Sequence, residues 1–155
     1  MVAFIVGFVI GLAVMGFIMW KMMPGMMIVT KKSKLSVDEA VEKIQQEAPN
    51  VGWSIPHIYD MDGTLSDKGY KGLKKIKILS LCKPEYAYTI LSRESDRKVS
   101  AAMPCRIAVY EDDMGRVYIS KFNIKLMGRM FGGVVGDVMA KVAQEEEAIL
   151  KGIVS

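Results

Sequence analysis

The sequence predicts an α+β fold: a small sheet of about four strands with helices packed on one face, plus one N-terminal transmembrane helix. Three observations support this prediction. The first twenty residues are all apolar or glycine, helix and strand patterns alternate irregularly after Leu35, and capping and turn residues separate those patterns. We therefore divide the chain into a transmembrane anchor at 1–21, a basic juxtamembrane linker at 22–34 and an α+β domain at 35–155.

The anchor is predicted from the 19 uncharged residues between Val2 and Trp20. A helix of that length spans roughly 28 Å, close to the hydrocarbon thickness of a bilayer. Trp20 and Lys21 suit the membrane interface, and Pro24–Gly25 is expected to end or kink the helix. A cleaved secretory signal is the alternative, but it would need basic residues before the apolar stretch and small residues after it. Neither is present, so we expect an uncleaved anchor.

The net charge of +4 is confined to a short segment after the anchor. Lys21, Lys31, Lys32 and Lys34 supply it, because the other 17 basic residues are matched by 17 acidic ones. By the positive-inside rule we expect a single-pass protein of the cell membrane with its domain in the cytoplasm. An electrically neutral domain also argues against a nucleic-acid partner.

A partner within the membrane is expected from the spacing of two glycines in the anchor. Gly7 and Gly11 form a Gly-xxx-Gly pair, which lets a second helix approach closely, although small residues are common in any membrane span. The chain is therefore expected to form a homo-oligomer or to join a larger membrane complex.

The first helix of the domain is predicted from a capping box, since Ser36 is followed three residues later by Glu39. An apolar stripe continues it, and Pro49 closes it. Alternation and turn residues predict the remaining elements. Strands are expected at 52–59, 75–81, 107–111 and 116–122, and helices at 84–93 and 134–150.

Acidic side chains outside these patterns receive structural interpretations. Asp60 and Asp62 lie among turn residues, where a side-chain carboxylate bonds the local backbone without any catalytic role. The run Glu145–Glu147 in the last helix is expected to form a solvated face.

Two cysteine-containing segments stand out, Leu81–Ala87 and Met103–Glu111. Together they resemble a family of small bacterial and archaeal domains called domain of unknown function 302. In that family a strand ends in Ala-Cys-Asn-Pro, and a later strand begins with Leu-Pro-Cys-Asn-Val-Val-Val. The resemblance covers residues 35–150. It implies an α+β fold and frequent homodimers, and it points to no particular activity, because none is established for the family in general.

The sequence departs from this family pattern at three positions. Lys83 and Arg106 replace the asparagines that follow the two cysteines, and Asn123 stands where the family often has proline. A site that depends on those asparagine amides is therefore in doubt.

Cys82 and Cys105 are the candidate metal or redox residues. Cys82 precedes a helix N-terminus beside Lys83, a position that lowers a thiol pKa and favours a thiolate. If a right-handed crossover made their strands parallel, the two cysteines would lie some 20 Å apart. Antiparallel strands, or a second subunit, would be needed to bring them together. The alternative is that both are small buried packing residues.

His57, the only histidine, is a candidate ligand for a metal or a haem, and the alternative is a hydrogen-bonded structural role. Our leading hypothesis is a non-enzymatic accessory or interaction protein held at the cytoplasmic membrane face. The second is a thiol-redox or soft-metal protein that binds copper, iron or zinc through Cys82 and Cys105. A haem-binding electron carrier using His57 is the third. A thiolate-bound metal is the cofactor that the residues suggest most directly.

Overall fold

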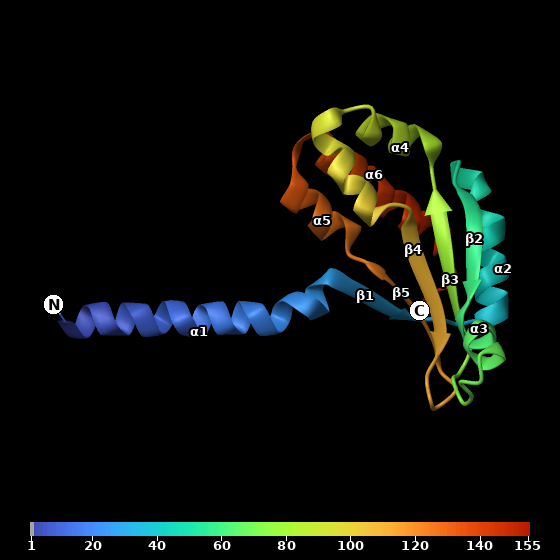
Figure 1. Ribbon diagram of the computed structural model, residues 1–155, viewed down its shortest axis with the longest axis horizontal. Helices are drawn as coiled ribbons and strands as arrows, with labels where there is room; N and C mark the ends of the chain where they lie inside the picture. Colours follow the sequence, from blue (N-terminus) through green and yellow to red (C-terminus); the bar gives the residue numbers. More distant parts are fainter. Residues whose placement is uncertain (1) are drawn as a thin grey trace.

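The computed structural model describes residues 2–155. A long helix projects from an α+β domain (Figure 1). The elements, in order, are α1 (Val2–Met27), β1 (Ile28–Lys32), α2 (Val37–Glu47), the 3₁₀ helix η1 (Pro49–Val51), β2 (Ser54–Asp60), α3 (Met61–Asp67), β3 (Ile76–Cys82), α4 (Pro84–Leu91), the 3₁₀ helix η2 (Glu94–Ala102), β4 (Cys105–Glu111), β5 (Val117–Phe122), α5 (Ile124–Phe131) and α6 (Gly133–Ile149).

The sheet has five strands in the order β1-β5-β4-β3-β2, and every neighbouring pair is antiparallel. This confirms the α+β class, and the four predicted strands correspond to β2 to β5. The fifth strand, β1, lies inside the segment 22–34 that the sequence suggests as a linker. The side chains of β1 show no alternation of buried and exposed positions, since Val29 is half-buried and the other four residues are exposed. Backbone pairing with β5, from Ile28 opposite Phe122 to Lys32 opposite Tyr118, holds it in place.

Strands β3 and β4 are antiparallel neighbours, with Leu81 opposite Cys105. The parallel crossover, which would separate the two cysteines by a strand length, is therefore excluded. The physical reason is the connection: α4 and η2 return the chain to the end of the sheet where β3 ended, so β4 starts beside it. Figure 1 shows both segments above that end of the sheet.

The core lies between one face of the sheet and the helices. Alternate residues of β3 and β4 are fully buried there, as expected for strands with one covered face. They pack with the apolar stripe of α2 and with α6 in one cluster. Its most buried members are Val37, Ala40, Ile44, Leu79, Leu81, Ile107, Val109, Ile119, Ile149 and Ile153.

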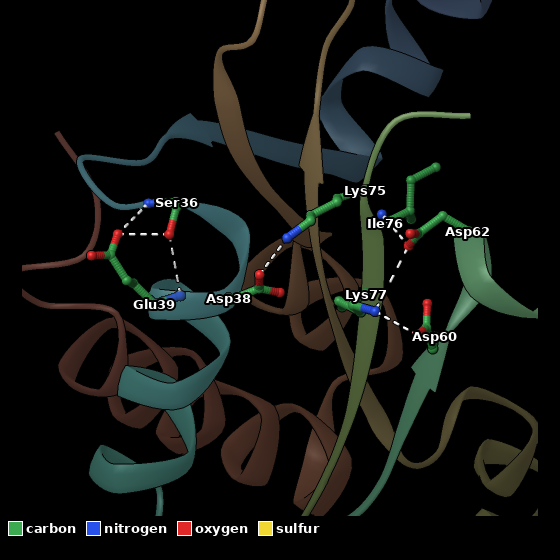
Figure 2. Close-up of polar contacts among 8 residues, drawn as sticks. All are labelled: Ser36, Asp38, Glu39, Asp60, Asp62, Lys75, Ile76 and Lys77. Carbon is green, nitrogen blue, oxygen red and sulfur yellow. Dashed lines mark hydrogen bonds and ion pairs between the residues drawn. The ribbon is translucent and has the colours of Figure 1, made fainter. Parts of the chain in front are cut away.

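Helix α2 begins at the predicted capping box (Figure 2). The amide of Glu39 donates to Ser36 Oγ at 3.4 Å, and the amide of Ser36 donates to Glu39 Oε2 at 2.9 Å. The side-chain and backbone hydrogen bonds with Ser36 lower the pKa of Glu39. In the first turn, Asp38 forms an ion pair with Lys75, which ties α2 to the start of β3.

Asp60 and Asp62 are structural, as the turn residues around them suggest. Asp60 caps α3 by accepting from the amide of Gly63 at 3.0 Å, and it pairs with Lys77 Nζ at 2.6 Å. Asp62 accepts from the amide of Ile76 at 2.8 Å (Figure 2). The hydrogen bond from Lys77 is the largest cause of the lowered pKa of Asp60. Both carboxylates thus fasten α3 to β3.

Helix α1 continues through Pro24–Gly25 to Met27, so of the two outcomes expected at this pair, an end or a kink, the end is wrong. Pro24 falls in the last turn, and β1 starts at the very next residue after the helix. Asn123 holds this junction: its amide donates to the Met27 carbonyl at 2.8 Å, and its Nδ2 donates to the Met26 carbonyl at 3.0 Å. Its Oδ1 also accepts from Leu126 at the start of α5, so one residue links α1 to α5.

Two glycines allow α5 and α6 to pack backbone against backbone. A Cβ at Gly136 would lie 2.8 Å from the carbonyl oxygen of Gly128, and a Cβ at Gly128 would lie 2.9 Å from Met139 Cβ. Neither obstacle is the far end of a flexible side chain. The α5–α6 contact therefore requires glycine at both positions.

Gly136→Ala is expected to lower the free energy of unfolding by about 1–3 kcal/mol, the usual cost of forcing a methyl group into a closely packed contact. The measurement is urea denaturation of the full chain in detergent micelles, followed by circular dichroism. Gly11→Ala is the matched control, because open space surrounds that position in α1. Equal midpoints for the two variants would contradict the required close approach.

Candidate functional site

A cavity of about 360 Å³ lies where β3 ends and β4 begins. Its volume falls within the range of small-molecule sites. We name it the cysteine cavity. It is lined by Trp53, Leu81, Cys82, Lys83, Tyr86, Ala87, Ile90, Val99, Ala101, Ala102, Met103, Pro104, Cys105, Arg106, Phe122, Ile124, Met127, Val138, Met139 and Val142. The wall is therefore mainly apolar and combines the sheet with α4, η2, α5 and α6.

The structure brings Cys82 and Cys105 to this one cavity. Both are free thiols and both are half-buried. Cys105 pairs with Leu81, so Cys82 lies one residue further along β3, at its last position. Successive strand residues point to opposite faces, yet both cysteines line the cavity, which lies at the end of β3 and the start of β4. The antiparallel pairing is what makes a shared site possible.

Cys105 is held as a neutral thiol. Burial, with a smaller contribution from the charge of Glu146, raises its pKa to about 12, and Lys121 opposes this only in part. Glu146 is 1% exposed and its carboxylate lies 2.6 Å from Lys121 Nζ. Burial also raises the pKa of Glu146, against the influence of Lys121. A buried ion pair therefore lies close to a thiol that does not ionise at neutral pH.

A second carboxylate, Glu145, organises the polar end of the cavity. It accepts from Trp53 Nε1 at 2.7 Å, from Lys83 Nζ at 2.9 Å and from the Tyr86 hydroxyl at 2.7 Å. Burial alone would raise the pKa of Glu145, but these three donors outweigh it and the pKa is lowered. Lys83 also donates to the Val51 carbonyl. Its ammonium is thus paired with Glu145 and is not a free charge beside Cys82.

The expectation that Glu145 and Glu146 form a solvated face is wrong. The physical reason is helix periodicity: residues 142, 145, 146 and 149 fall on one face of α6, and Val142 and Ile149 are buried core residues. This spacing is the signal by which both acids could have been identified. Glu147, the third of the run, is exposed.

His57 lies apart from the cysteine cavity. It is exposed on β2, opposite Ser80 of β3, and its ring packs edge-on against Tyr59 with centroids 4.2 Å apart. It is not among the residues that line the cavity. The structure therefore does not bring the candidate haem ligand together with the candidate thiols.

Three methionines that were not singled out in the sequence join the two cysteines around the cavity: Met103, Met127 and Met139. Five sulfur-containing side chains thus border one mainly apolar space. Thiols and thioethers suit soft metals such as Cu(I), and methionine is also an adaptable lining for an apolar ligand. Among residues 2–155, no group of three or more His, Cys, Asp or Glu residues is placed to hold a metal ion. A metal here would depend on sulfur.

The two cysteines are expected to differ in reactivity toward iodoacetamide at neutral pH. With a pKa of about 12 in place of 9.0, Cys105 has on the order of a thousandfold less thiolate than an ordinary cysteine. Cys82 should be modified first. Timed labelling followed by peptide mass spectrometry measures this, and urea-unfolded protein, in which both react alike, is the control. Equal rates in the folded chain would contradict the neutral, buried thiol.

Comparison with known proteins assigns the domain. Residues 29–155 match the family described as domain of unknown function DUF302, which is most of the chain and includes β1. The chain belongs to the DUF302 family. The match confirms the resemblance seen in the two cysteine segments and places α1 before the DUF302 domain.

A solved DUF302 structure has the same fold. The crystal structure of an uncharacterized conserved DUF302 protein from Bacillus stearothermophilus superimposes with a TM-score of 0.71 at 21% identity. The alignment covers 81% of this chain and 96% of that chain. At this identity the likeness establishes the fold alone. No curated protein matches the chain.

Two departures from the DUF302 pattern have structural roles here. Lys83, in place of asparagine, lines the cavity and forms the ion pair with Glu145. Asn123, in place of proline, donates its backbone N–H to the end of α1, and proline has no N–H to donate. The second departure therefore supplies hydrogen bonds to the end of the apolar helix.

Proposed function

We propose that this chain is a single-pass membrane protein in which α1 remains as an uncleaved anchor and presents the DUF302 domain at the cytoplasmic membrane face, as a non-enzymatic accessory or interaction protein. The observation that carries this proposal is the exposure of α1 at every position from Val6 to Met26. Val6–Met27 contains an 18-residue window with a mean hydropathy of 1.9, and no residue of that window is buried against the domain. Such a surface needs an apolar environment from outside the chain. A signal sequence would meet the same criteria of length and composition.

The junction with the domain supports an anchor over a removable signal. α1 passes directly into β1, and Asn123 bonds its last two carbonyl groups. Cleavage near this point would remove partners from a folded element. Lys21, Lys31, Lys32 and Lys34 are all exposed around the junction, and the positive-inside rule favours the cytoplasm for this side.

The partner proposed for the anchor is a second membrane helix, in a homo-oligomer or a larger membrane complex. Around the positions that a Cβ would occupy at Gly7 and Gly11 there is open space, so that face of α1 is free for close packing. Crosslinking in intact membranes tests this. Gly7→Leu with Gly11→Leu should abolish a crosslinked species that the control Gly16→Leu retains; equal crosslinking in all variants would exclude the Gly-xxx-Gly contact.

Membrane fractionation of the full chain tests the anchor itself. The protein should stay with membranes after alkaline carbonate washing, and intact-mass spectrometry should find residues 1–21 still attached. For topology, a cysteine at Met114, exposed in the β4–β5 turn, should react with a membrane-impermeant maleimide only after cell lysis. Release of a chain shortened by α1 would overturn the anchor, and labelling in intact cells would reverse the orientation.

A second candidate function is a thiol-redox or soft-metal site for copper, iron or zinc. The observation that favours it is the antiparallel pairing, which brings Cys82 and Cys105 to one cavity with three methionines. Metal binding would release a proton from each thiol, and because the pKa of Cys105 is high, affinity should rise with pH.

Anaerobic purification of the full chain, metal analysis by mass spectrometry and a free-thiol count test this second candidate. Stoichiometric metal that is lost in Cys82→Ser and kept in the control Ser92→Ala would favour a metal site. Two free thiols without metal would exclude it for the purified state. An absorption spectrum of wild type and His57→Ala tests the haem hypothesis in the same preparation.

A further inference from the structure

We propose that α5, together with Phe122, rests on the surface of the bilayer that α1 crosses, with its apolar side chains at the acyl-chain boundary and its basic side chains at anionic headgroups. We name Phe122–Phe131 the α5 surface. This inference rests on the proposed anchor, and it adds a second, peripheral membrane contact made by the DUF302 domain itself.

The α5 surface exposes large apolar side chains on the outer face of the helix and at its two ends. Met130 is 73% exposed on the face opposite Ile124 and Gly128, which are buried against the domain, and Phe122 and Phe131, at the two ends of the segment, are each 48% exposed. The helix is therefore anchored by one face and leaves apolar side chains uncovered on the other face and at its ends. Apolar groups gathered in this way mark an interaction site.

The charges on this surface suit a phospholipid partner. Lys125 and Arg129 are exposed one helical turn apart, and Leu126 and Met130 follow them on the same side of α5. From Phe122 to Gly136 the sequence contains no acidic residue. Basic side chains mixed with apolar ones on an outward helix face are typical of helices that lie in the membrane interface.

The position of α5 relative to α1 decides between a lipid surface and other partners. Asn123 donates to the carbonyl groups of Met26 and Met27, so the start of α5 is within hydrogen-bond contact of the end of the apolar helix. The apolar span ends at Met27, six residues (about 9 Å of helix) beyond the interfacial Lys21, which places this contact on the headgroup side of the bilayer edge. In Figure 1, α1 projects to the left and α5 occupies the left edge of the domain. A surface beside the point where the anchor leaves the bilayer is held next to lipid at all times, whereas a soluble partner protein would have to diffuse to it.

The test uses the full chain in nanodiscs of phosphatidylcholine and phosphatidylglycerol, at one chain per disc. An environment-sensitive fluorophore is attached to Phe131→Cys, to Phe17→Cys in α1 or to Met114→Cys in the β4–β5 turn, each in a Cys82→Ser, Cys105→Ser background. We expect nitroxide lipids labelled near the headgroup to quench position 131 several-fold more than position 114. Position 17 should respond to nitroxides deep in the bilayer.

The outcomes separate this inference from the proposed anchor. If position 17 is in lipid and position 131 behaves like 114, the α5 contact is wrong and the anchor stands. If position 17 is also in water, the anchor itself is wrong. Shielding of position 131 that appears only at two chains per disc would identify a second copy as the occupant and overturn the lipid assignment.

A measurement without cysteine substitutions covers the case in which the labelled background does not fold. Hydrogen exchange of the peptide containing 122–131 is followed for the wild-type chain in nanodiscs with and without phosphatidylglycerol. We expect slower exchange with the anionic lipid, and loss of that difference in Lys125→Glu with Arg129→Glu. Equal exchange with and without phosphatidylglycerol would contradict an electrostatic contribution to the contact. Exchange that is as fast in nanodiscs as in detergent would overturn the lipid contact as a whole.

Discussion

Replacing Lys121 by methionine is expected to lower the free energy of unfolding by about 3–5 kcal/mol, the cost of leaving a buried charge without its partner. Lys121 is 11% exposed and Glu146 1%, and their charged atoms are 2.6 Å apart. The variant would leave the Glu146 carboxylate enclosed by the core. Urea denaturation of the full chain in micelles measures the loss, and Lys125→Met, at an exposed position, is the control.

The loss should depend on pH. The pKa of Glu146 is already raised, chiefly by burial, and removing Lys121 raises it further. When the pKa of a carboxyl is higher in the folded than in the unfolded protein, its contribution to stability is fully present at pH below the unfolded pKa. That contribution is lost as the pH rises through the folded pKa. The loss in free energy of unfolding caused by Lys121→Met should therefore be small at acidic pH and large at neutral pH. Lys121→Met with Glu146→Leu should recover most of the stability; equal losses at both pH values would contradict this account.

Glu145→Ala is expected to cost about 2–4 kcal/mol, because it removes the acceptor for Trp53, Lys83 and Tyr86 together. Its pH dependence has the opposite sign. The donors lower the pKa of Glu145 despite its burial, so its stability is present above the unfolded pKa and is lost as the pH falls through the folded one.

The neighbouring acid provides the control for Glu145. Glu147 is exposed on the same helix, and Glu147→Ala should change stability by less than about 0.5 kcal/mol. Denaturation at neutral and acidic pH compares the two variants. Similar effects for both would show that the hydrogen bonds at the polar end of the cavity contribute little.

Local patterns were sufficient for most of the fold. The capping box at Ser36, the alternation in β2 to β5 and the apolar face of α6 each follow from residues close together in the sequence. β1 could not be predicted in this way, because backbone bonds to β5 hold it and its side chains carry no period. The strand direction that unites the cysteines was also open, since a connection as long as 84–102 can return the chain to either end of a sheet.

The candidate site was predicted only in part. Cys82 and Cys105 were identified because their segments resemble a known family, but the cavity between them is also lined by Trp53, α4, η2 with the connection after it, β5, α5 and α6, which are six further parts of the chain. Met103, Met127 and Met139 reach it from three separate elements or connections, and no local pattern relates them. Glu145 and Glu146 belong to a run of three acidic residues, and such a run predicts a solvent-exposed surface. Only the helix periodicity indicates that two of the three face the domain.

The direct passage from α1 into β1 limits where a partner can be. A domain that is joined to its membrane anchor by a flexible linker can take many positions above the bilayer. Here Met27 ends α1 and Ile28 begins β1, so no linker residues separate the helix from the sheet. A rotation of α1 about its axis would turn the edge of the sheet with it. With α1 in its proposed role as an anchor, a protein or small molecule that uses this domain would have to come to within one domain's height of the lipid, and a change in the packing of α1 against a partner helix would reorient the cysteine cavity.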